Sequence, residues 1–437
     1  MILINSPRNT IITGFNCRPV AEACAKAGYQ DIVVIDYFGD LDIRSIAAKG
    51  HYFMEETDGT GDVDAFRRWV LTMVEREVTH GRKIAEPSRG KPWIIAGGGF
   101  DDEPYFWKRF AELGTLLGNA ARNVQQARNL VTLSNLIKDS KIKIEIPRTK
   151  RVVIDKDMDL ATLFQELRQK FPFPFLVKRS RTAGGAGIDF IEDDASIQRF
   201  TDHVSGKIKR DPRYAETYHV QEYVGGPGAR DISVIACNDR VVCKTRQIIG
   251  EPRLHAPKRF SYCGNSIPLE PMPPALENAI EQLVKTLHDG CGLRGIYGID
   301  LVQASGGLHL VEVNPRIPGS LEPASIALVS NLINAHVKSF MKGKQARALA
   351  SHVYEPKYHV IKLILFASEE FTMPALNRVE LSGQVHDITQ PRTKLSPGMP
   401  VITYLHRGPL DTPEENEANA WQDVEALYKR FSSGTRE

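Results

Sequence analysis

Two carboxylates and one amide share a face of a predicted hairpin, GIDLVQASGGLHLVEVNPR, at residues 298–316. If residues 305–307 form its loop, Asp300 lies opposite Glu312, and the two-residue period of a strand places Asn314 on the same face. Two carboxylates in this arrangement repel each other unless a cation lies between them. Because Mg²⁺ and Mn²⁺ prefer oxygen ligands, we predict a divalent metal site at Asp300, Glu312 and Asn314.

The same register makes further predictions for this hairpin. Val302 is expected opposite Leu310, while Val311 and Val313 are expected on the apolar face away from the metal. The alternative is a solvated sheet face on which the two acids only form salt bridges. Arg316, two residues after the amide, favours the metal site because it supplies a cation where a transferred phosphoryl group needs one. We therefore predict that Arg316 is a catalytic residue.

A second region with phosphate-binding chemistry lies upstream, at 175–188 (FLVKRSRTAGGAGI). An apolar strand ends in Lys178, whose flexible ammonium group suits the phosphates of a nucleotide and is predicted to be both cofactor-binding and catalytic. The small residues that follow allow backbone N–H groups to approach the same phosphates; those predicted to do so are Thr182, Gly184, Gly185 and Gly187. The alternative is a purely structural turn between two strands, and the GxxxxGK(S/T) motif of a P-loop is absent.

The stretch between these regions, HVQEYVGGPGARDIS at 219–233, predicts a hinge with free backbone groups. A short apolar strand stops near Val224 at a run of glycines and then restarts, which leaves main-chain groups free to receive an adenine edge. Glu222 or Asp231 can accept a hydrogen bond from a ribose hydroxyl group. We predict that these three residues bind the nucleoside.

In this order and spacing, the three regions resemble the ATP-grasp superfamily, and the resemblance covers roughly residues 120–340. It implies that Lys178 binds nucleotide phosphates and that 182–187 form a mobile glycine-rich loop. It implies further that QEYV at 221–224 is the adenine hinge and that the three oxygen ligands hold magnesium. Arg316 would steady an acyl phosphate or the incoming group.

The chain departs from the family pattern at the first metal ligand and at the ribose-binding acid. Asp300 stands where many members carry glutamate, and Asp231 lies only near the usual position of a glutamate. A second basic residue for the phosphates is expected near the position of Arg128. GFNCRPVAEACAKAGY near the start, LLGN at 116–119 and RQIIG at 246–250 resemble a group of ATP-grasp carboligases related to biotin carboxylase.

The first 110 or so residues alternate short strands with amphipathic helices, which predicts an α/β layer. A strand at 10–14, a helix opened by Pro19 and a strand at 31–36 make a βαβ unit. A dinucleotide site is rejected because only Gly14 stands where GxGxxG needs three glycines. With the resemblance, we predict a mixed α/β (α+β ATP-grasp) fold in three parts: a Rossmann-like pre-ATP-grasp domain at 1–119, a two-lobed ATP-grasp module at 120–345 and a β-rich C-terminal region with a closing helix at 346–437.

Periodicity and turn residues predict the remaining elements. Helices are expected at 120–137, 160–170, 273–290, 322–341 and 414–432. Strands are expected through 175–250, in a hairpin at 296–314 and through the β-rich section 358–407.

Composition limits the class of protein. A net charge of +3 over 437 residues is too small to predict nucleic-acid binding. The six cysteines include no CxxC pair, which argues for free thiols in a reducing compartment and against a zinc site. No apolar run approaches the roughly 20 residues of a spanning helix, and no signal peptide is evident, so we predict a cytoplasmic protein without membrane partners.

The resemblance implies an ATP-dependent carboxylate–amine (or thiol) ligase of small-molecule or cofactor biosynthesis. ATP and Mg²⁺ would be the cofactors, a small carboxylate and a nucleophile the substrates, and a homodimer the assembly typical of the family. Two alternatives stay open. One is a biotin-carboxylase-like enzyme that uses bicarbonate, which would need a separate carrier because no biotin-accepting lysine context of the AMKM kind is present. The other is a nucleotide-binding protein without turnover.

Overall fold

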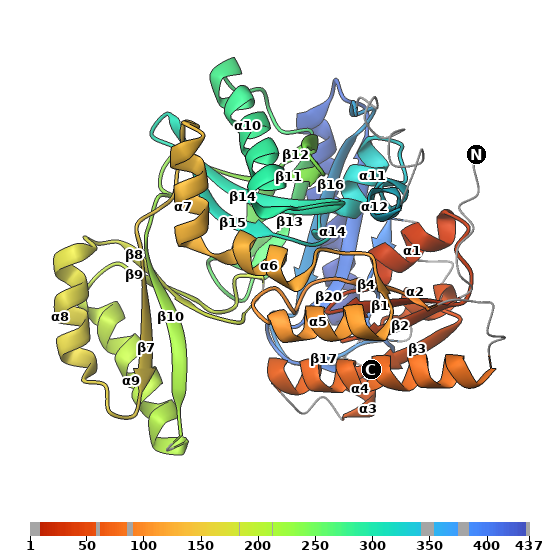
Figure 1. The fold of residues 1–437 in the computed structure, drawn as a ribbon, viewed down its shortest axis with the longest axis horizontal. Helices are drawn as coiled ribbons and strands as arrows, with labels where there is room; N and C mark the ends of the chain where they lie inside the picture. The colour runs from red at the N-terminus through yellow and green to blue at the C-terminus, as the bar shows by residue number, and fades with distance from the viewer. Residues whose placement is uncertain are drawn as a thin grey trace.

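The structure is a computed structural model that describes residues 9–57, 62–84, 91–182, 184–211, 213–341, 354–374 and 384–433, with a small lobe projecting from a larger body (Figure 1). Its N-terminal part is a parallel sheet with the strand order β3 (Lys49–Tyr52), β2 (Ile32–Asp36), β1 (Thr10–Gly14), β4 (Trp93–Ala96), β5 (Thr115–Leu116). The accompanying helices are α1 (Arg18–Lys26), α2 (Leu41–Ile46), α3 (Phe53–Glu56), α4 (Val63–Ile84) and α5 (Pro104–Leu113). The predicted βαβ unit is confirmed.

The acid at the end of β2 has a structural role in this sheet. Asp36 is buried and accepts hydrogen bonds from the backbone N–H groups of Cys17 (2.7 Å), Phe38 (3.0 Å) and Gly39 (2.9 Å). These bonds join the turns that follow β1 and β2. The carboxylate therefore faces the protein's own main chain, in agreement with the rejection of a dinucleotide site.

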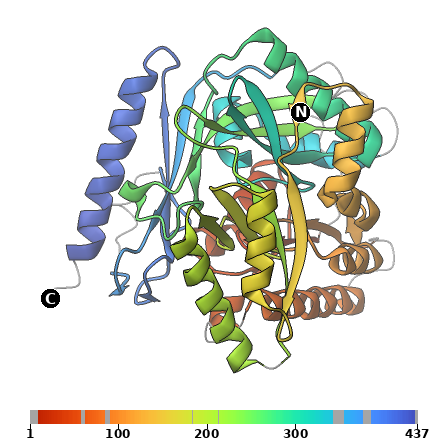
Figure 2. The same cartoon turned by 90° about the vertical axis from the view of Figure 1, so that its left-hand side faces the viewer.

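The small lobe is an antiparallel sheet with the order β7 (Thr149–Asp155), β10 (Ala215–Glu222), β8 (Phe175–Arg179), β9 (Ile188–Ile191). Helices α8 (Leu160–Lys170) and α9 (Asp194–Arg210) cover one of its faces (Figure 2). The prediction of α8 is confirmed. The prediction of mainly strands over 175–250 is wrong at α9, which begins with a capping box between Asp193 and Ser196 and buries Phe200 and Val204 in the lobe.

The body contains a mixed sheet with the order β18 (Val385–His386), β20 (Pro400–Gly408), β16 (His359–Phe366), β13 (Tyr262–Ile267), β12 (Arg240–Ile249), β11 (Arg230–Cys237), β14 (Ile296–Ala304), β15 (Gly307–Asn314), β6 (Ile144–Glu145). β17 (Phe371–Thr372) and β19 (Lys394–Leu395) form a separate pair. The predicted hairpin and the β-rich C-terminal section are confirmed. The domain boundary predicted after residue 345 lies outside the described residues. It separates strands of one sheet, since β16, β18 and β20 extend the sheet of β11–β15, and it stays a prediction.

Helices complete the body. α10 (Pro274–Cys291) and α14 (Pro413–Ser433) are confirmed, and η2 (Pro252–Leu254) is a 3₁₀ turn. Two predicted helices are wrong in length, because each is a pair: α6 (Ala121–Arg128) with α7 (Leu130–Asp139), and α11 (Leu321–Ala327) with α12 (Leu332–Phe340). In each pair an asparagine side chain caps the second helix: Asn129 accepts from the N–H of Val131 at 2.9 Å, and Asn331 from that of Ile333 at 3.3 Å.

Two global predictions can be compared with this fold. All six cysteines are buried and none forms a disulfide, so the free thiols are confirmed. Within the described ranges, no helix combines the length and apolar character that crossing a membrane requires.

Candidate nucleotide and metal site

The β14–β15 hairpin places its two acids opposite each other, although its turn differs from the prediction. Asp300 pairs with Glu312, as predicted, and Asn314 lies on the same face. The turn has only two central residues, Ser305 and Gly306, with φ of 51° and 78°. Two successive positive φ values are typical of a type I′ turn. The predicted three-residue loop is therefore wrong.

A β-bulge restores the register before the acids are reached. Next to the turn, Val302 pairs with His309, so the predicted pair of Val302 and Leu310 is wrong. Val311 is an extra residue on β15, and it shifts the pairing by one position so that Asp300 lies opposite Glu312. Val311 is half-buried, which contradicts its predicted place on the apolar face, whereas Val313 lies in the core as predicted. Bulges commonly re-aim side chains next to functional sites.

The two carboxylates have opposite protonation preferences. Asp300 accepts a hydrogen bond from the amide of Asn314 at 2.8 Å. Burial, and then the neighbouring charge of Glu312, raise the pKa of Asp300 to about 7. Burial also disfavours ionised Glu312, but the charges of Arg128 and Lys178 outweigh it, so the pKa of Glu312 is lowered. Glu312 is therefore ionised near neutral pH, where Asp300 titrates.

This donor set fits a hard divalent cation. Asp300, Glu312 and Asn314 offer carboxylate and amide oxygens without nitrogen or sulfur ligands, as Mg²⁺ and Mn²⁺ prefer. Burial, and then the neighbouring charge of Glu312, raise the pKa of Asp300, and a bound dication would favour the ionised form of both acids. We keep these residues as proposed metal ligands.

Two arginines reach the acids from outside the hairpin. Arg128, at the end of α6, donates from Nη1 to Glu312 and from Nε to Asp102 Oδ1 at 2.8 Å. Arg316, just after β15, donates from Nε to Asp101 Oδ2 at 2.8 Å. Arg128 thus lies where the resemblance expects a phosphate-binding base, and Arg316 lies beside the proposed metal ligands in an ion pair with the loop that follows β4.

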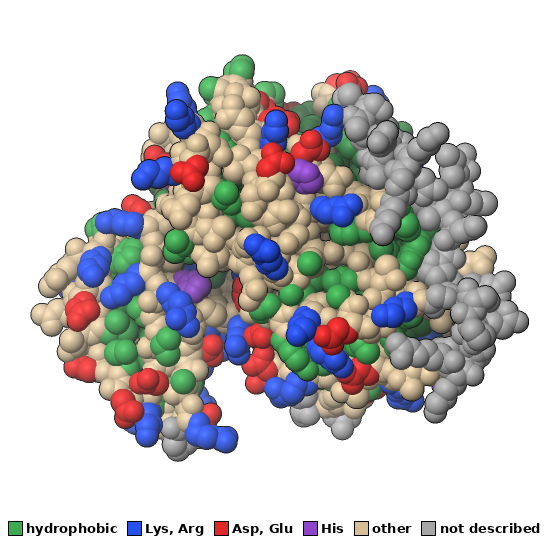
Figure 3. Space-filling view, in the orientation of Figure 1, with side chains coloured by type: hydrophobic (Ala, Val, Ile, Leu, Met, Phe, Trp, Pro, Cys, Tyr) green, Lys and Arg blue, Asp and Glu red, His purple; other side chains and the backbone are tan. Residues whose placement is uncertain are grey.

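Lys178 approaches the same group of charges from the small lobe. Burial, assisted by the charge of Arg128, lowers its pKa to about 8, while Glu312 and Asp300 act in the opposite direction. Such mutual influence requires these groups to lie close together. Figure 3 shows a hollow between the small lobe and the body, with Lys, Arg, Asp and Glu side chains around it. The two lobes therefore bring a lysine, an arginine and two acids to one place.

The glycine-rich loop lies against the connection between β12 and β13. The carbonyl oxygen of Gly184 accepts a hydrogen bond from the N–H of Tyr262 at 3.2 Å. Gly185 has a φ of 79°, and a Cβ there would lie 1.8 Å from the carbonyl oxygen of Phe260. Only glycine fits this approach, so the loop is closed against the body.

The ends of this loop are joined through Arg179. Thr182 Oγ1 donates to the carbonyl oxygen of Arg179 at 3.0 Å. The N–H of Arg179 in turn donates to the carbonyl oxygen of Gly187 at 2.8 Å. Ala183 lies outside the described residues. The structure thus places Thr182 and Gly187 against Arg179, the residue after Lys178, and the contacts of all four loop residues with phosphate remain a proposal.

The predicted nucleoside residues lie at the junction of the two lobes. Glu222 ends β10 and accepts from the N–H of Arg148 at 3.2 Å, Val224 follows in the connection to β11, and Asp231 lies in β11, where burial raises its pKa. Among the residues that the structure describes, no hydrogen bond or ion pair links these three to the acids of the hairpin. They lie at the end of β10, in the connection to β11 and in β11, and their role in binding the nucleoside remains a proposal.

Residues 144–320 match the sequence model of a family described as the ATP-grasp domain. The match includes Lys178, Arg316 and the three proposed metal ligands. This chain contains an ATP-grasp domain.

Known proteins and solved structures are similar to this chain over much of its length. The carbamoyl phosphate synthase large chain of Clostridium botulinum (strain Loch Maree / Type A3) is 23% identical over 272 residues, which are 61% of this chain but only 23% of that protein. The biotin carboxylase domain of the Hydrogenobacter thermophilus 2-oxoglutarate carboxylase, solved with MgADP, ADP and bicarbonate, has a TM-score of 0.65 and 14% identity, covering 94% of this chain and 89% of that one. The N5-carboxyaminoimidazole synthetase of Staphylococcus aureus, solved with ADP, has a TM-score of 0.62 and 13% identity, covering 96% of this chain and 98% of that one.

These similarities confirm the predicted ATP-grasp fold, and they show that the fold is similar to that of a biotin carboxylase domain. The two solved structures contain ADP, one of them with magnesium, and the predicted ligase activity of this chain with ATP and Mg²⁺ remains a proposal. The similarities leave the substrates of this chain open.

The sequence reading missed the acids that connect the N-terminal sheet to the ATP-grasp domain. Asp101, Asp102 and Glu103 lie in the loop after β4, beside the carboxyl end of β1, where open α/β sheets commonly bind ligands. Gly98 lets this loop approach Arg316, because a Cβ there would lie 3.3 Å from the guanidinium carbon. The available signal was a run of three acids, one residue after the three glycines that follow β4.

Proposed function

We propose that this chain is an ATP-dependent ligase that phosphorylates a small carboxylate and passes the acyl group to an amine or thiol. The observation that carries the proposal is the meeting of Lys178, Arg128 and the Asp300–Glu312 pair between the lobes. These charges suit nucleotide phosphates together with a divalent cation, and phosphoryl transfer is catalysed mainly by positioning and charge neutralisation.

The proposed reaction has two steps. A carboxylate oxygen attacks the γ-phosphorus of ATP, the bond to the bridging oxygen breaks, and ADP leaves an acyl phosphate behind. The nucleophile then attacks the acyl carbon, the carbon–oxygen bond to phosphate breaks, and the nucleophile loses a proton. Mg²⁺ held by Asp300, Glu312 and Asn314 would supply neutralising charge at the phosphates.

The chain's own residues divide the work. Lys178 and Arg128 bind and orient the phosphates, and Arg316 holds the carboxylate as it becomes an acyl phosphate. The loop at 182–187 covers the site against water, which would otherwise hydrolyse the acyl phosphate. The nucleoside is held at the lobe junction by Glu222, Val224 and Asp231. In this scheme the 1–119 domain presents the substrate to the 120–345 module, and 346–437 extends its sheet.

Bicarbonate is a second candidate for the carboxylate. One similar structure contains bicarbonate beside MgADP, and another is a synthetase of a carboxylated amine. Phosphorylated bicarbonate is a mixed anhydride that an amine can attack in the same second step, so the site needs no further catalytic group. A biotin carrier would have to be a separate protein.

Release of ADP and phosphate with MgATP tests the proposal. A panel of carboxylates including bicarbonate is assayed, each with and without candidate amines and thiols. Release that requires one carboxylate and one nucleophile is expected, and release with bicarbonate and an amine would select the second candidate. Tight MgATP binding without release across the panel would contradict the ligase and indicate a nucleotide-binding protein.

A further inference from the structure

Three consecutive acids after β4 each form an ion pair with an arginine from a different part of the ATP-grasp site. Asp101 Oδ2 lies 2.8 Å from Arg316 Nε, Asp102 Oδ1 lies 2.8 Å from Arg128 Nε, and Glu103 Oε1 lies 2.7 Å from Arg181 Nε. Their partners follow β15, end α6 and belong to the loop after β8. One loop of the N-terminal sheet thus reaches three cations around the proposed phosphate site.

The three pairs differ in exposure and therefore in strength. Arg181 is 55% exposed, so water weakens its pair with Glu103. Asp102 and Arg128 are 27% and 20% exposed. Burial alone would raise the pKa of Asp102, but the charge of Arg128, and a hydrogen bond from the main chain of Arg181, lower it. Asp102 is therefore ionised and contacts both Arg128 and the main chain of Arg181, the residue before the glycine-rich loop.

Arg128 divides its guanidinium between two acids. Nε donates to Asp102, while Nη1 donates to Glu312, the proposed metal ligand. A dication bound by Glu312 would compete with Arg128 for that carboxylate, and the arginine would then need another partner to stay beside the phosphates. Asp102 supplies this partner through a different nitrogen of the same rigid fork.

A role for Asp102 in capping α5 does not account for these contacts. Acids before a helix are often stabilised by the positive end of its dipole. Here the N-cap position of α5 is Glu103, which makes no side-chain cap hydrogen bond, and the Asp102 carboxylate is directed to Arg128.

We propose that Asp102 is a positioning residue that keeps Arg128 beside the nucleotide phosphates when Mg²⁺ takes its place at Glu312. This inference rests on the proposed nucleotide and metal site. Without the charge of Asp102, Arg128 keeps Glu312 as its hydrogen-bonded acid, and Mg²⁺ has to displace a stronger pair. Asp102 thereby links the N-terminal sheet to the binding of magnesium and nucleotide.

The test compares ADP affinity with Mg²⁺ and with EDTA, measured by calorimetry on the full chain. In Asp102→Asn, the factor by which Mg²⁺ strengthens ADP binding is expected to fall about tenfold, as is typical of partners that orient a metal ligand. Metal-free ADP should bind as well as in wild type or better, because an acid near the phosphates has lost its charge. A structural defect would weaken both affinities together. An unchanged magnesium factor would overturn the proposal.

Further variants keep the outcome interpretable. Asp102→Glu, which retains the charge, should recover most of the magnesium factor even if Asp102→Asn folds poorly. In an Arg128→Gln background, Asp102→Asn should no longer change the factor, and an equal change with or without Arg128 would overturn the proposal. Glu112→Gln, in the helix α5 that follows the loop of Asp102 but paired with the surface residue Arg109, is the matched control. If wild type shows no effect of Mg²⁺ on ADP affinity, the proposed function itself fails; an effect in wild type that survives in Asp102→Asn contradicts this inference alone.

Discussion

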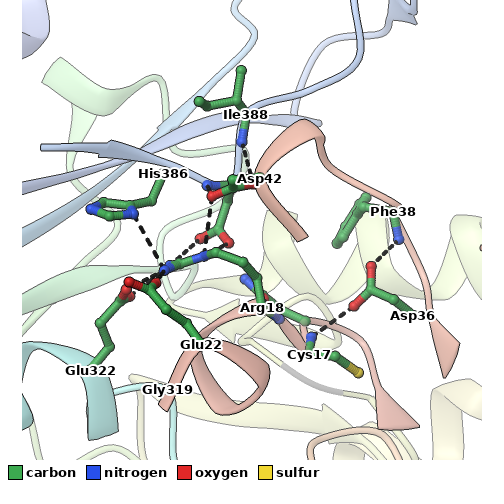
Figure 4. Close-up of polar contacts among 12 residues, drawn as sticks. Cys17, Arg18, Glu22, Asp36, Phe38, Asp42, Gly319, Glu322, His386 and Ile388 are labelled. Atoms are coloured by element: carbon green, nitrogen blue, oxygen red, sulfur yellow. Dashed lines mark hydrogen bonds and ion pairs between the residues drawn. The ribbon is translucent and has the colours of Figure 1, made fainter. Parts of the chain in front are cut away.

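Arg18 and Arg128 are both held by carboxylates from distant parts of the chain, but their surroundings differ. Arg18, near the start of α1, is 1% exposed, and it donates from Nε to Asp387 Oδ1 at 2.7 Å, from Nη2 to Glu322 Oε2 at 2.7 Å and from Nη1 to Glu22 Oε2 at 3.0 Å (Figure 4). Each nitrogen of this guanidinium has an acid partner. Arg18 therefore joins α1 to α11 and to the strand region around β18.

The Arg18 cluster also contains a group with metal-ligand geometry. In the described part of the chain, Glu22, Glu322 and His386 are the one set of three His, Cys, Asp or Glu side chains close enough to share an ion. Arg18 already supplies the positive charge there, since it binds both acids and lies 3.4 Å from His386 Nδ1. Lys26 pairs with Glu22 and Lys362 with Glu322, so two further cations share the charge of these acids.

The site around Arg128 has like charges left close together. Lys178 has a lowered pKa partly because Arg128 is near, and Asp300 has a raised pKa partly because Glu312 is near. Such mutual perturbation is common at functional sites, where a ligand completes the charge balance. Repulsion between acids also remains near Arg18, where burial and then the charge of Asp387 raise the pKa of Asp42, so the feature that distinguishes the Arg128 site is its place at the hollow between the lobes.

The largest effect is expected for Arg18→Met, on stability. The substitution removes the guanidinium that binds buried Glu322 and Asp387 and leaves them only Lys362, which lies 3.8 Å from Glu322; breaking a buried pair in this way costs about 3–5 kcal/mol. Thermal and urea unfolding measure the loss. ADP affinity of the folded fraction should not change, because Arg18 lies outside the nucleotide site.

Arg109→Met is the matched control for this prediction. Arg109 also pairs with two acids, Glu75 and Glu112, but on the surface, so water screens the interaction and little change in stability is expected. Equal destabilisation by the two substitutions would contradict the structural role given to Arg18.

The next effect is expected for Glu312→Gln, on function. The amide keeps the shape of the side chain but loses the charge that binds the cation, so magnesium-dependent turnover should fall by roughly 100-fold or more. Stability should change little, because Glu312 is 43% exposed and Arg128 keeps Asp102 as its partner. ADP release, the magnesium dependence of ADP affinity and the melting temperature are the measurements.

Glu145→Gln controls for the loss of one negative charge on the same sheet. Glu145 is 82% exposed beside His309, away from the proposed ligands, and its substitution should leave all three measurements unchanged. Full activity together with a wild-type magnesium dependence in Glu312→Gln would remove the metal site from this hairpin.

Features that depend on neighbouring residues could be predicted from the sequence. The helix at 160–170 and the Asp300–Glu312 pair follow from periodicity and turn residues, and the structure has both. The pair was nevertheless predicted with the wrong turn: a two-residue loop and the bulge at Val311 shift the register in opposite directions and cancel at the acids. Alternation fixes which residues share a face but not where an extra residue is inserted.

Features that join distant segments could not be predicted in this way. Asp102 and Arg128 are 26 positions apart, and Arg18 and Asp387 are 369 apart. Nothing in local spacing selects these partners from the many other charged residues, because the fold brings them together. The missed helix α9 is a different case, since its Asp193 cap and the apolar spacing of Phe200 and Val204 were visible in the sequence.

The smallest effect is expected from the titration of Lys178. It tests whether this lysine belongs to the site around Arg128. With a pKa of about 8, the free ammonium group is mostly charged at pH 7 and mostly neutral at pH 9. Only the charged form attracts phosphate, so metal-free ADP affinity should be highest at the lower pH and fall up to about tenfold as the pH rises through this range. The terminal phosphate of ADP is already ionised in this pH range.

Lys178→Arg is the control, because arginine keeps its charge throughout. The ADP affinity of this variant should show only the pH dependence contributed by Asp300, which titrates nearer pH 7. The same tenfold fall in both proteins would assign the titration to another group and separate Lys178 from the phosphates.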